Sequence, residues 1–96
     1  MQNFIQKLFK RENFSVFPNP TTKGKVVNLT INNKGNYFVE LIDGQSTLLH
    51  EENLIIQDKH EVKLFNIPSA IKNGVYYIRV THAETKKQFT DSILVM

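Results

Sequence analysis

The stretch of residues 74–82, GVYYIRVTH, constrains the fold more than any other part of this sequence. Tyr76, Ile78 and Val80 occupy every second position of it, with bulky or polar residues between them. This period of two is typical of a β-strand with one face buried and the other facing outward. Because Gly74 follows a run of turn-forming residues, the pattern predicts a central strand that the chain enters through a turn.

Tyr76 also lies a short distance after the pair Ile67 and Pro68. This separation is typical of the tyrosine corner of immunoglobulin-like sandwiches, in which the phenol hydroxyl bonds to backbone a few residues upstream. We therefore expect Tyr76 to fix a corner of the fold.

Six further segments have strand patterns and are separated by turns rich in Gly, Asn and Pro. Seven short strands at intervals of about ten residues, without a long helix, predict an all-β fold. The expected architecture is an immunoglobulin-like antiparallel β-sandwich of about seven strands. The six segments are residues 14–17, 25–32, 37–42, 47–56, 61–65 and 86–95.

Three of these segments raise questions about which side chains face inward. Residues 47–56 suit a strand with a bulge or a one-turn helix, and we adopt the strand. Strict alternation in residues 61–65 predicts that Val62 and Leu64 face the core. The same alternation places Asp91 on the apolar face of the last strand, which predicts a β-bulge near it.

The tripeptide Pro18, Asn19 and Pro20 follows directly after the first predicted strand. Each proline fixes its own φ angle and lacks a backbone donor. Such a segment cannot continue a central ladder of hydrogen bonds. We expect it to lie at a sheet edge or to cross from one sheet to the other.

The 96 residues predict a single domain with one core. Residues 14–96 would form the β-sandwich. Residues 1–13 are expected to be a leader or linker, and their apolar residues have the spacing of a short amphipathic helix. They contain lysines and glutamines where a signal peptide needs an unbroken apolar region, so an export signal would lie elsewhere.

Charge and composition exclude several classes of function. The net charge of +3 comes from 12 basic and 9 acidic residues, and the basic ones are spread along the chain. A nucleic-acid partner is not expected, because such proteins usually gather their cations into a patch. No stretch approaches the roughly 20 apolar residues of a membrane span. The absence of cysteine excludes disulfides and thiolate chemistry.

The sequence offers no set of residues typical of catalysis. His50, His60 and His82 lie far apart, and only His50 and Glu52 would share a strand face. We interpret this pair as part of a solvated polar face. There is no glycine-rich phosphate loop and no nucleophile elbow. We therefore expect no enzyme activity, no cofactor and no metal.

Aromatic side chains suggest one alternative function. If Phe17, Tyr37, Phe38 and Tyr77 were exposed together, they would form a stacking platform for a sugar or peptide. The chain would then be a cell-surface adhesion or glycan- or peptide-binding sandwich.

Three segments in order resemble the type A C-terminal sorting domain of the Bacteroidetes type IX (Por) secretion system. They are residues 14–20 (FSVFPNP), residues 39–44 (VELIDG), and Ile67 and Pro68 leading to residues 74–80 (GVYYIRV). The resemblance covers about residues 14–96. It implies an immunoglobulin-like sandwich at the end of a larger secreted protein.

The resemblance also implies a function and partners. The domain would direct a covalently linked passenger across the outer membrane, without catalysis, after transit through the periplasm. Its partners would be the outer-membrane translocon and the associated sorting peptidase, and the passenger would reach the outer-membrane surface or the medium. The implied sorting-motif residues are Pro18, Asn19, Pro20, Gly74, Tyr76, Phe89, Ile93 and Val95.

Overall fold

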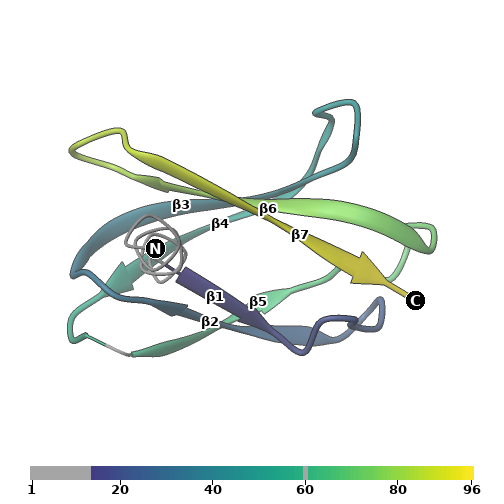
Figure 1. Ribbon diagram of the computed structural model, residues 1–96, viewed down its shortest axis with the longest axis horizontal. Coiled ribbons are helices and arrows are strands. Elements are labelled where there is room, and N and C mark those ends of the chain that lie inside the picture. The colour runs from purple at the N-terminus through teal and green to yellow at the C-terminus, as the bar shows by residue number, and fades with distance from the viewer. Residues whose placement is uncertain (1–13, 60) are drawn as a thin grey trace, which may run out of the picture.

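The computed structural model describes residues 14–59 and 61–96, and it consists of two β-sheets packed face to face (Figure 1). One sheet has three strands in the order β1-β2-β5, and the other has four in the order β4-β3-β6-β7. Residues 1–13, which were expected to be a leader, linker or short helix, lie outside the described residues, and so does His60. The strands are β1 (Phe14–Phe17), β2 (Val26–Ile31), β3 (Gly35–Ile42), β4 (Leu48–Ile56), β5 (Val62–Asn66), β6 (Gly74–His82) and β7 (Gln88–Val95).

Every pair of neighbouring strands within the two sheets is antiparallel. The chain crosses from one sheet to the other after β2, after β4 and after β5. This arrangement confirms the predicted immunoglobulin-like sandwich, with β6 in the centre of the larger sheet. It also makes β1 an edge strand, as the following prolines predicted.

The core fills the space between the sheets and comes from alternate residues of the central strands. Full burial of an aliphatic or aromatic side chain stabilises the fold by about 1.5–3 kcal/mol. The inward positions predicted for Val27, Leu29 and Ile31 are confirmed. The completely buried side chains include Val27, Leu29, Val39, Leu41, Phe65, Ile78, Val80 and Val95.

Strand β4 contains the bulge that its sequence suggested. Leu41 pairs with His50 and Ile42 pairs with Leu48, so Leu49 has no partner on β3. One extra residue on a strand bends it and increases its twist. The apolar residues of this segment therefore form a bulged strand and not a helical turn.

Asp43 closes the β3–β4 hairpin through its side chain. Its Oδ1 accepts hydrogen bonds from the backbone N–H groups of Gln45 (2.8 Å) and Thr47 (2.9 Å). These bonds hold the pKa of the Asp43 carboxyl below its usual value, with the Thr47 bond contributing most. The hairpin turn that Asp43 and Gly44 predicted is therefore fixed by a carboxylate.

The inward face predicted for residues 61–65 was wrong. Val62 and Leu64 are 54% and 57% exposed, whereas Phe65 is completely buried. A one-residue shift in phase moves every side chain of a strand to the opposite face. The burial of Phe65 together with Ile67 outweighs the burial of Val62 and Leu64, because the aromatic ring removes more apolar surface from water. Lys63 lies on the same face as Phe65 but stays partly exposed, with its Nζ 3.2 Å from Oε2 of Glu61.

The bulge predicted near Asp91 is also absent. Pairing between β6 and β7 runs without a shift in register from Gly74 and Val95 to Thr81 and Gln88. Asp91 nevertheless stays exposed, because β7 is an edge strand and its side chain can reach solvent. Its Oδ1 accepts a hydrogen bond from the backbone N–H of Ser92 at 2.9 Å.

Gly35 occupies a backbone position that excludes other residues. Its φ is +142°, and a Cβ there would lie 2.5 Å from Nε2 of His82. That imidazole packs edge-on against Tyr37, with ring centroids 5.0 Å apart, so it has little freedom to move. We expect Gly35→Ala to lower the free energy of unfolding by about 1–3 kcal/mol, measured by urea denaturation.

Gly44→Ala is the matched control for this prediction, because a Cβ at Gly44 would meet nothing within 4 Å. It should change stability little. Equal unfolding free energies for the two variants would show that the close approach to His82 carries no strain.

Candidate functional site

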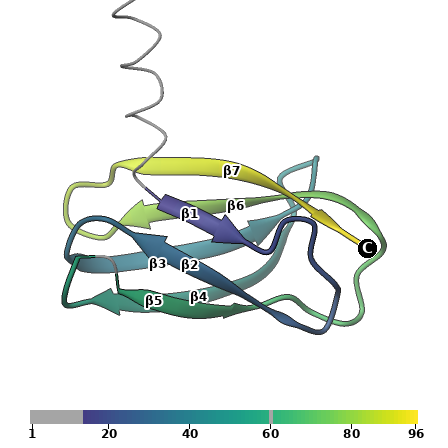
Figure 2. The ribbon, with the colours of Figure 1, turned by 60° about the horizontal axis from the view of Figure 1, so that its bottom comes forward.

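The segment after β1 leaves the smaller sheet and reaches the edge of the larger one (Figure 2). Pro18, Asn19 and Pro20 are all exposed on this path. The next residue, Thr21, is buried and forms an isolated parallel bridge with Val95 on β7. The segment therefore lies at a sheet edge, one of the two expected placements, and this edge is the C-terminal end of β7.

The Asn19 side chain takes the place of a backbone partner on the edge of β7. Its Oδ1 accepts a hydrogen bond from the backbone N–H of Leu94 at 3.0 Å, and its Nδ2 donates to the carbonyl of Ser92 at 3.1 Å. A carboxamide presents one acceptor and adjacent donors, as a peptide group does. Asparagine therefore pairs with β7 between two prolines that lack the N–H needed for such pairing.

Thr21 continues this pairing through its backbone. Its N–H donates to the carbonyl of Leu94 at 2.8 Å, and its carbonyl accepts from the N–H of Met96 at 2.9 Å. We call residues 19–21 the edge latch. Together with Asp91, which binds the N–H of Ser92, the edge latch binds the carbonyl of Ser92, both backbone groups of Leu94 and the N–H of Met96.

Tyr76 lies beneath this end of the sandwich and forms the predicted corner. Its side chain is buried, and its hydroxyl donates to the carbonyl of Lys72 at 2.6 Å. Gly74 begins β6 with φ +154°, a region that favours glycine. In the register of β6 and β7, Tyr76 is opposite Ile93 and Gly74 is opposite Val95.

The structure thus brings most of the expected motif residues to one end of the molecule. Phe89 is the exception, since it pairs with Val80 toward the other end of β7. It lines a shallow hollow there with polar and aromatic neighbours. The lining residues are Asn33, Tyr37, His82, Thr85, Lys87 and Phe89. The residues gathered at the C-terminal end are Pro18, Asn19, Pro20, Gly74, Tyr76, Ile93 and Val95.

A second tyrosine corner, which sequence reasoning missed, lies beside that hollow. The hydroxyl of Tyr37 donates to the carbonyl of Asn33 at 2.9 Å, four residues upstream, as in the Tyr76 corner. Burial raises the pKa of the Tyr37 phenol. The signal was present in the sequence, because Gly-Asn-Tyr at residues 35–37 and Gly-Val-Tyr at residues 74–76 share one spacing.

The predicted aromatic platform is not formed. Tyr37 is buried between the sheets, and Phe17 belongs to the smaller sheet. Phe38 and Tyr77 both face outward on the larger sheet, but Phe38 is opposite Thr81 and so lies four residues along the ladder from Tyr77. At about 3.3 Å per residue this separation prevents joint stacking on one ring.

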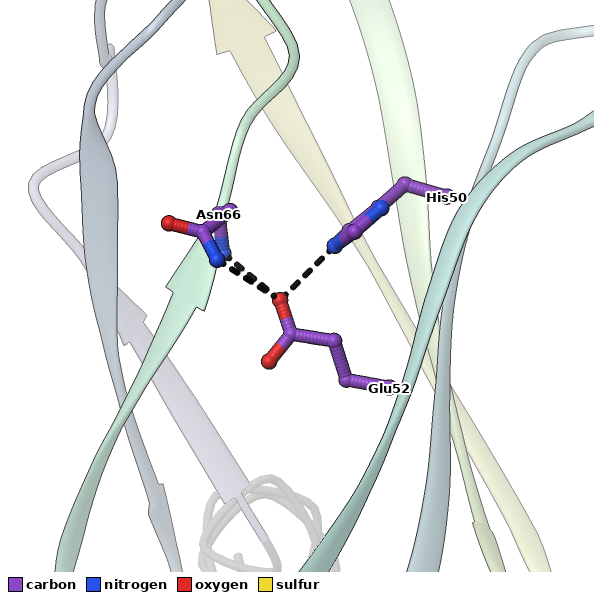
Figure 3. A network of polar contacts seen from close by, with 3 residues as sticks. All are labelled: His50, Glu52 and Asn66. Atoms are coloured by element: carbon purple, nitrogen blue, oxygen red, sulfur yellow. Dashed lines mark hydrogen bonds and ion pairs between the residues drawn. The ribbon is translucent and has the colours of Figure 1, made fainter.

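His50 and Glu52 meet, as their shared face allowed, and they join the two sheets (Figure 3). Nε2 of His50 lies 2.7 Å from Oε2 of Glu52, which also accepts hydrogen bonds from the backbone N–H of Asn66 at 3.0 Å and from its Nδ2 at 3.3 Å. The imidazole packs on Phe65 with ring centroids 5.3 Å apart. The carboxylate therefore closes the side of the sandwich between β4 and β5, and the pair is more enclosed than the predicted solvated face.

Residues 14–59 and 61–96 contain no group of three or more His, Cys, Asp or Glu side chains placed to hold a metal ion. Within the same residues, no helix is long and apolar enough to cross a membrane.

The fold and the site define an immunoglobulin-like domain whose N-terminal proline motif is bound to its C-terminal strand. Residues 15–95 match the model of the family described as the secretion system C-terminal sorting domain. The chain belongs to this family, which is the sorting domain of type IX secretion in Bacteroidetes. Such domains imply a passenger protein, type IX machinery, and export to the outer-membrane surface or secretion. No curated protein matches the chain.

The buried hydroxyl of Thr21 allows a test of how much the edge latch contributes to stability. Its side chain is buried, and its Oγ1 has no hydrogen-bond partner within the described part of the chain. A buried hydroxyl without a partner is unfavourable, so Thr21→Val should raise the free energy of unfolding by about 1 kcal/mol. Denaturant unfolding measures this change, and the exposed Thr22→Val is the control. A destabilised Thr21→Val variant would show that the hydroxyl is satisfied.

Proposed function

We propose that this chain is a non-catalytic sorting signal that directs a covalently linked passenger across the outer membrane through the type IX translocon. The passenger crosses the periplasm first, and a sorting peptidase acts on the domain afterwards. The signal consists of the surface at the C-terminal end of the sandwich. Membership of the sorting-domain family supports the class of function.

The observation that carries the proposal is the pair of hydrogen bonds between Asn19 and β7. They connect residues 73 and 75 positions apart in the sequence. An N-terminal motif and a C-terminal strand that are joined in this way present a single surface. A receptor could read that surface only in the folded domain, which suits a signal that performs no reaction.

Most of the proposed signal residues have a distinct structural role at this surface. Pro18 and Pro20 fix the exposed path of the chain, and Asn19 binds the β7 edge. Tyr76 and Gly74 hold the turn below it. Ile93 and Val95 anchor the C-terminal strand in the core, and Phe89 packs at its opposite end. Substituting an anchor would unfold the domain, whereas substituting Asn19 would alter the surface alone.

The experiment appends the complete 96-residue chain to a periplasmic reporter in a Bacteroidetes host with an active type IX system. The intact fusion is expected at the surface or in the medium. The same fusion without residues 89–96 is expected to stay in the periplasm. Equal export of the intact and shortened fusions would refute the proposal. The reporter without any added domain is the control for leakage.

A further inference from the structure

We infer that the outward edge of β7 over residues 92–96 is a strand-acceptor edge, which the edge latch covers until a partner replaces it. The partner that fits is an extended peptide segment of the secretion machinery. This inference rests on the proposed function, since it names how that machinery would engage the domain.

The edge has the hydrogen-bonding pattern of a strand that lacks a neighbour. Both the N–H and the carbonyl of Leu94 point away from β6 and bind the edge latch. Residues two apart on a strand present their backbone groups to the same side, so Ser92 and Met96 belong to this edge as well. Their groups bind Asn19, Asp91 and Thr21. An approaching strand could supply every one of these partners from its backbone.

The edge latch is a weaker cover than a full strand would be. Two of its hydrogen bonds come from the exposed side chain of Asn19, where water competes for both groups. Pro18 and Pro20 have no backbone N–H to donate to β7, so Asn19 pairs through its side chain and Thr21 alone in the edge latch supplies a backbone donor. The buried hydroxyl of Thr21 has no hydrogen-bond partner among residues 14–59 and 61–96. Burying it therefore weakens the binding of the edge latch to β7. Each of these features favours replacement of the edge latch by a continuous strand.

The side chains around the edge indicate what kind of strand would bind. Leu94 and Val75 are opposite each other on the outer face of the larger sheet and are 38% and 55% exposed. Met96, at the end of the edge, is 60% exposed. A strand added to β7 would place alternate side chains beside these residues. The expected partner therefore carries apolar residues at every second position.

Amide hydrogen exchange of the full chain tests whether the edge latch opens. In Asn19→Ala the amide of Leu94 should exchange at least about tenfold faster than in the parent, because its acceptor is gone. The amides of Ile93 and Val95, which point toward β6 by alternation, should keep their rates. Thr21→Val should slow the exchange of Leu94 and Met96. Unchanged rates in Asn19→Ala would overturn the inference.

Sedimentation tests whether the uncovered edge accepts a strand, with a second copy of the chain as the probe. Two β7 edges can pair around a two-fold axis, so Asn19→Ala should form dimers at concentrations where the parent is monomeric. Adding Leu94→Pro removes an edge donor without breaking the pairing with β6, and it should restore the monomer. An Asn19→Ala variant that stays monomeric would refute the acceptor edge.

Export of the reporter fusion tests whether the machinery uses this edge. Leu94→Pro should stop export while Ile93 and Val95 stay protected from exchange. Leu94→Thr, which keeps the backbone N–H, should be exported. Export of Leu94→Pro, or loss of export in both variants, would overturn the inference. If the parent fusion itself stays in the periplasm, the proposed function fails, and the exchange and sedimentation results alone decide whether β7 accepts a strand.

Discussion

Replacing Tyr76 with alanine is expected to lower the free energy of unfolding by about 3–5 kcal/mol, the range for removing a buried aromatic side chain. Tyr76 is only 9% exposed, and it packs in the core opposite Ile93. Its loss also leaves the carbonyl of Lys72 without its hydroxyl partner. Equilibrium unfolding in urea measures the change. A variant that unfolds at the same urea concentration as the parent would contradict the corner described above.

Tyr76→Phe separates the two contributions. It keeps the ring in the core and removes only the hydrogen bond to Lys72, so it should cost about 0.5–1.5 kcal/mol. If Tyr76→Phe lowers the free energy of unfolding as much as Tyr76→Ala does, the hydrogen bond stabilises the turn and packing of the ring contributes little. If it has no effect, the corner bond contributes nothing to stability.

Replacing Phe65 with alanine should likewise cost about 3–5 kcal/mol, because its side chain is completely buried between the sheets. Leu64→Ala, one residue earlier, is the matched control, since Leu64 is 57% exposed. It should change stability by less than about 0.5 kcal/mol. Urea unfolding of both variants gives their free energies of unfolding, and the larger loss shows which face of β5 packs in the core. The opposite ranking would mean that Leu64 faces the core.

The sequence alone did not predict which face of β5 points into the core. β1 and β6 were predicted with the bounds that the structure gives them, because proline or glycine delimits each and alternation is clear. In β5 apolar residues occupy both faces, as Val62 and Leu64 on one and Phe65 on the other. Local pattern cannot choose between two such faces. The choice depends on which set meets the opposite sheet.

The residues of the candidate site and its local Tyr76 corner were predictable, but its contacts between distant segments were not. The two prolines required Pro18, Asn19 and Pro20 to leave the first sheet. Nothing local indicated that Asn19 would bind β7, because its partners Ser92 and Leu94 lie 73 and 75 residues away. The link from Glu52 to Asn66 spans 14 residues and was missed for the same reason. Among the contacts that were missed, the Tyr37 corner is the one with a local signal, in its repeated Gly-x-Tyr spacing.

Location of the reporter fusion in two matched hosts tests the central claim most directly. One host has the type IX outer-membrane translocon and the other has it deleted, and both express the reporter joined to the complete chain. We expect the reporter to reach the surface or medium only in the first host and to accumulate in the periplasm of the second. Equal amounts outside both hosts, or retention in both, would contradict the claim that this domain is a type IX sorting signal.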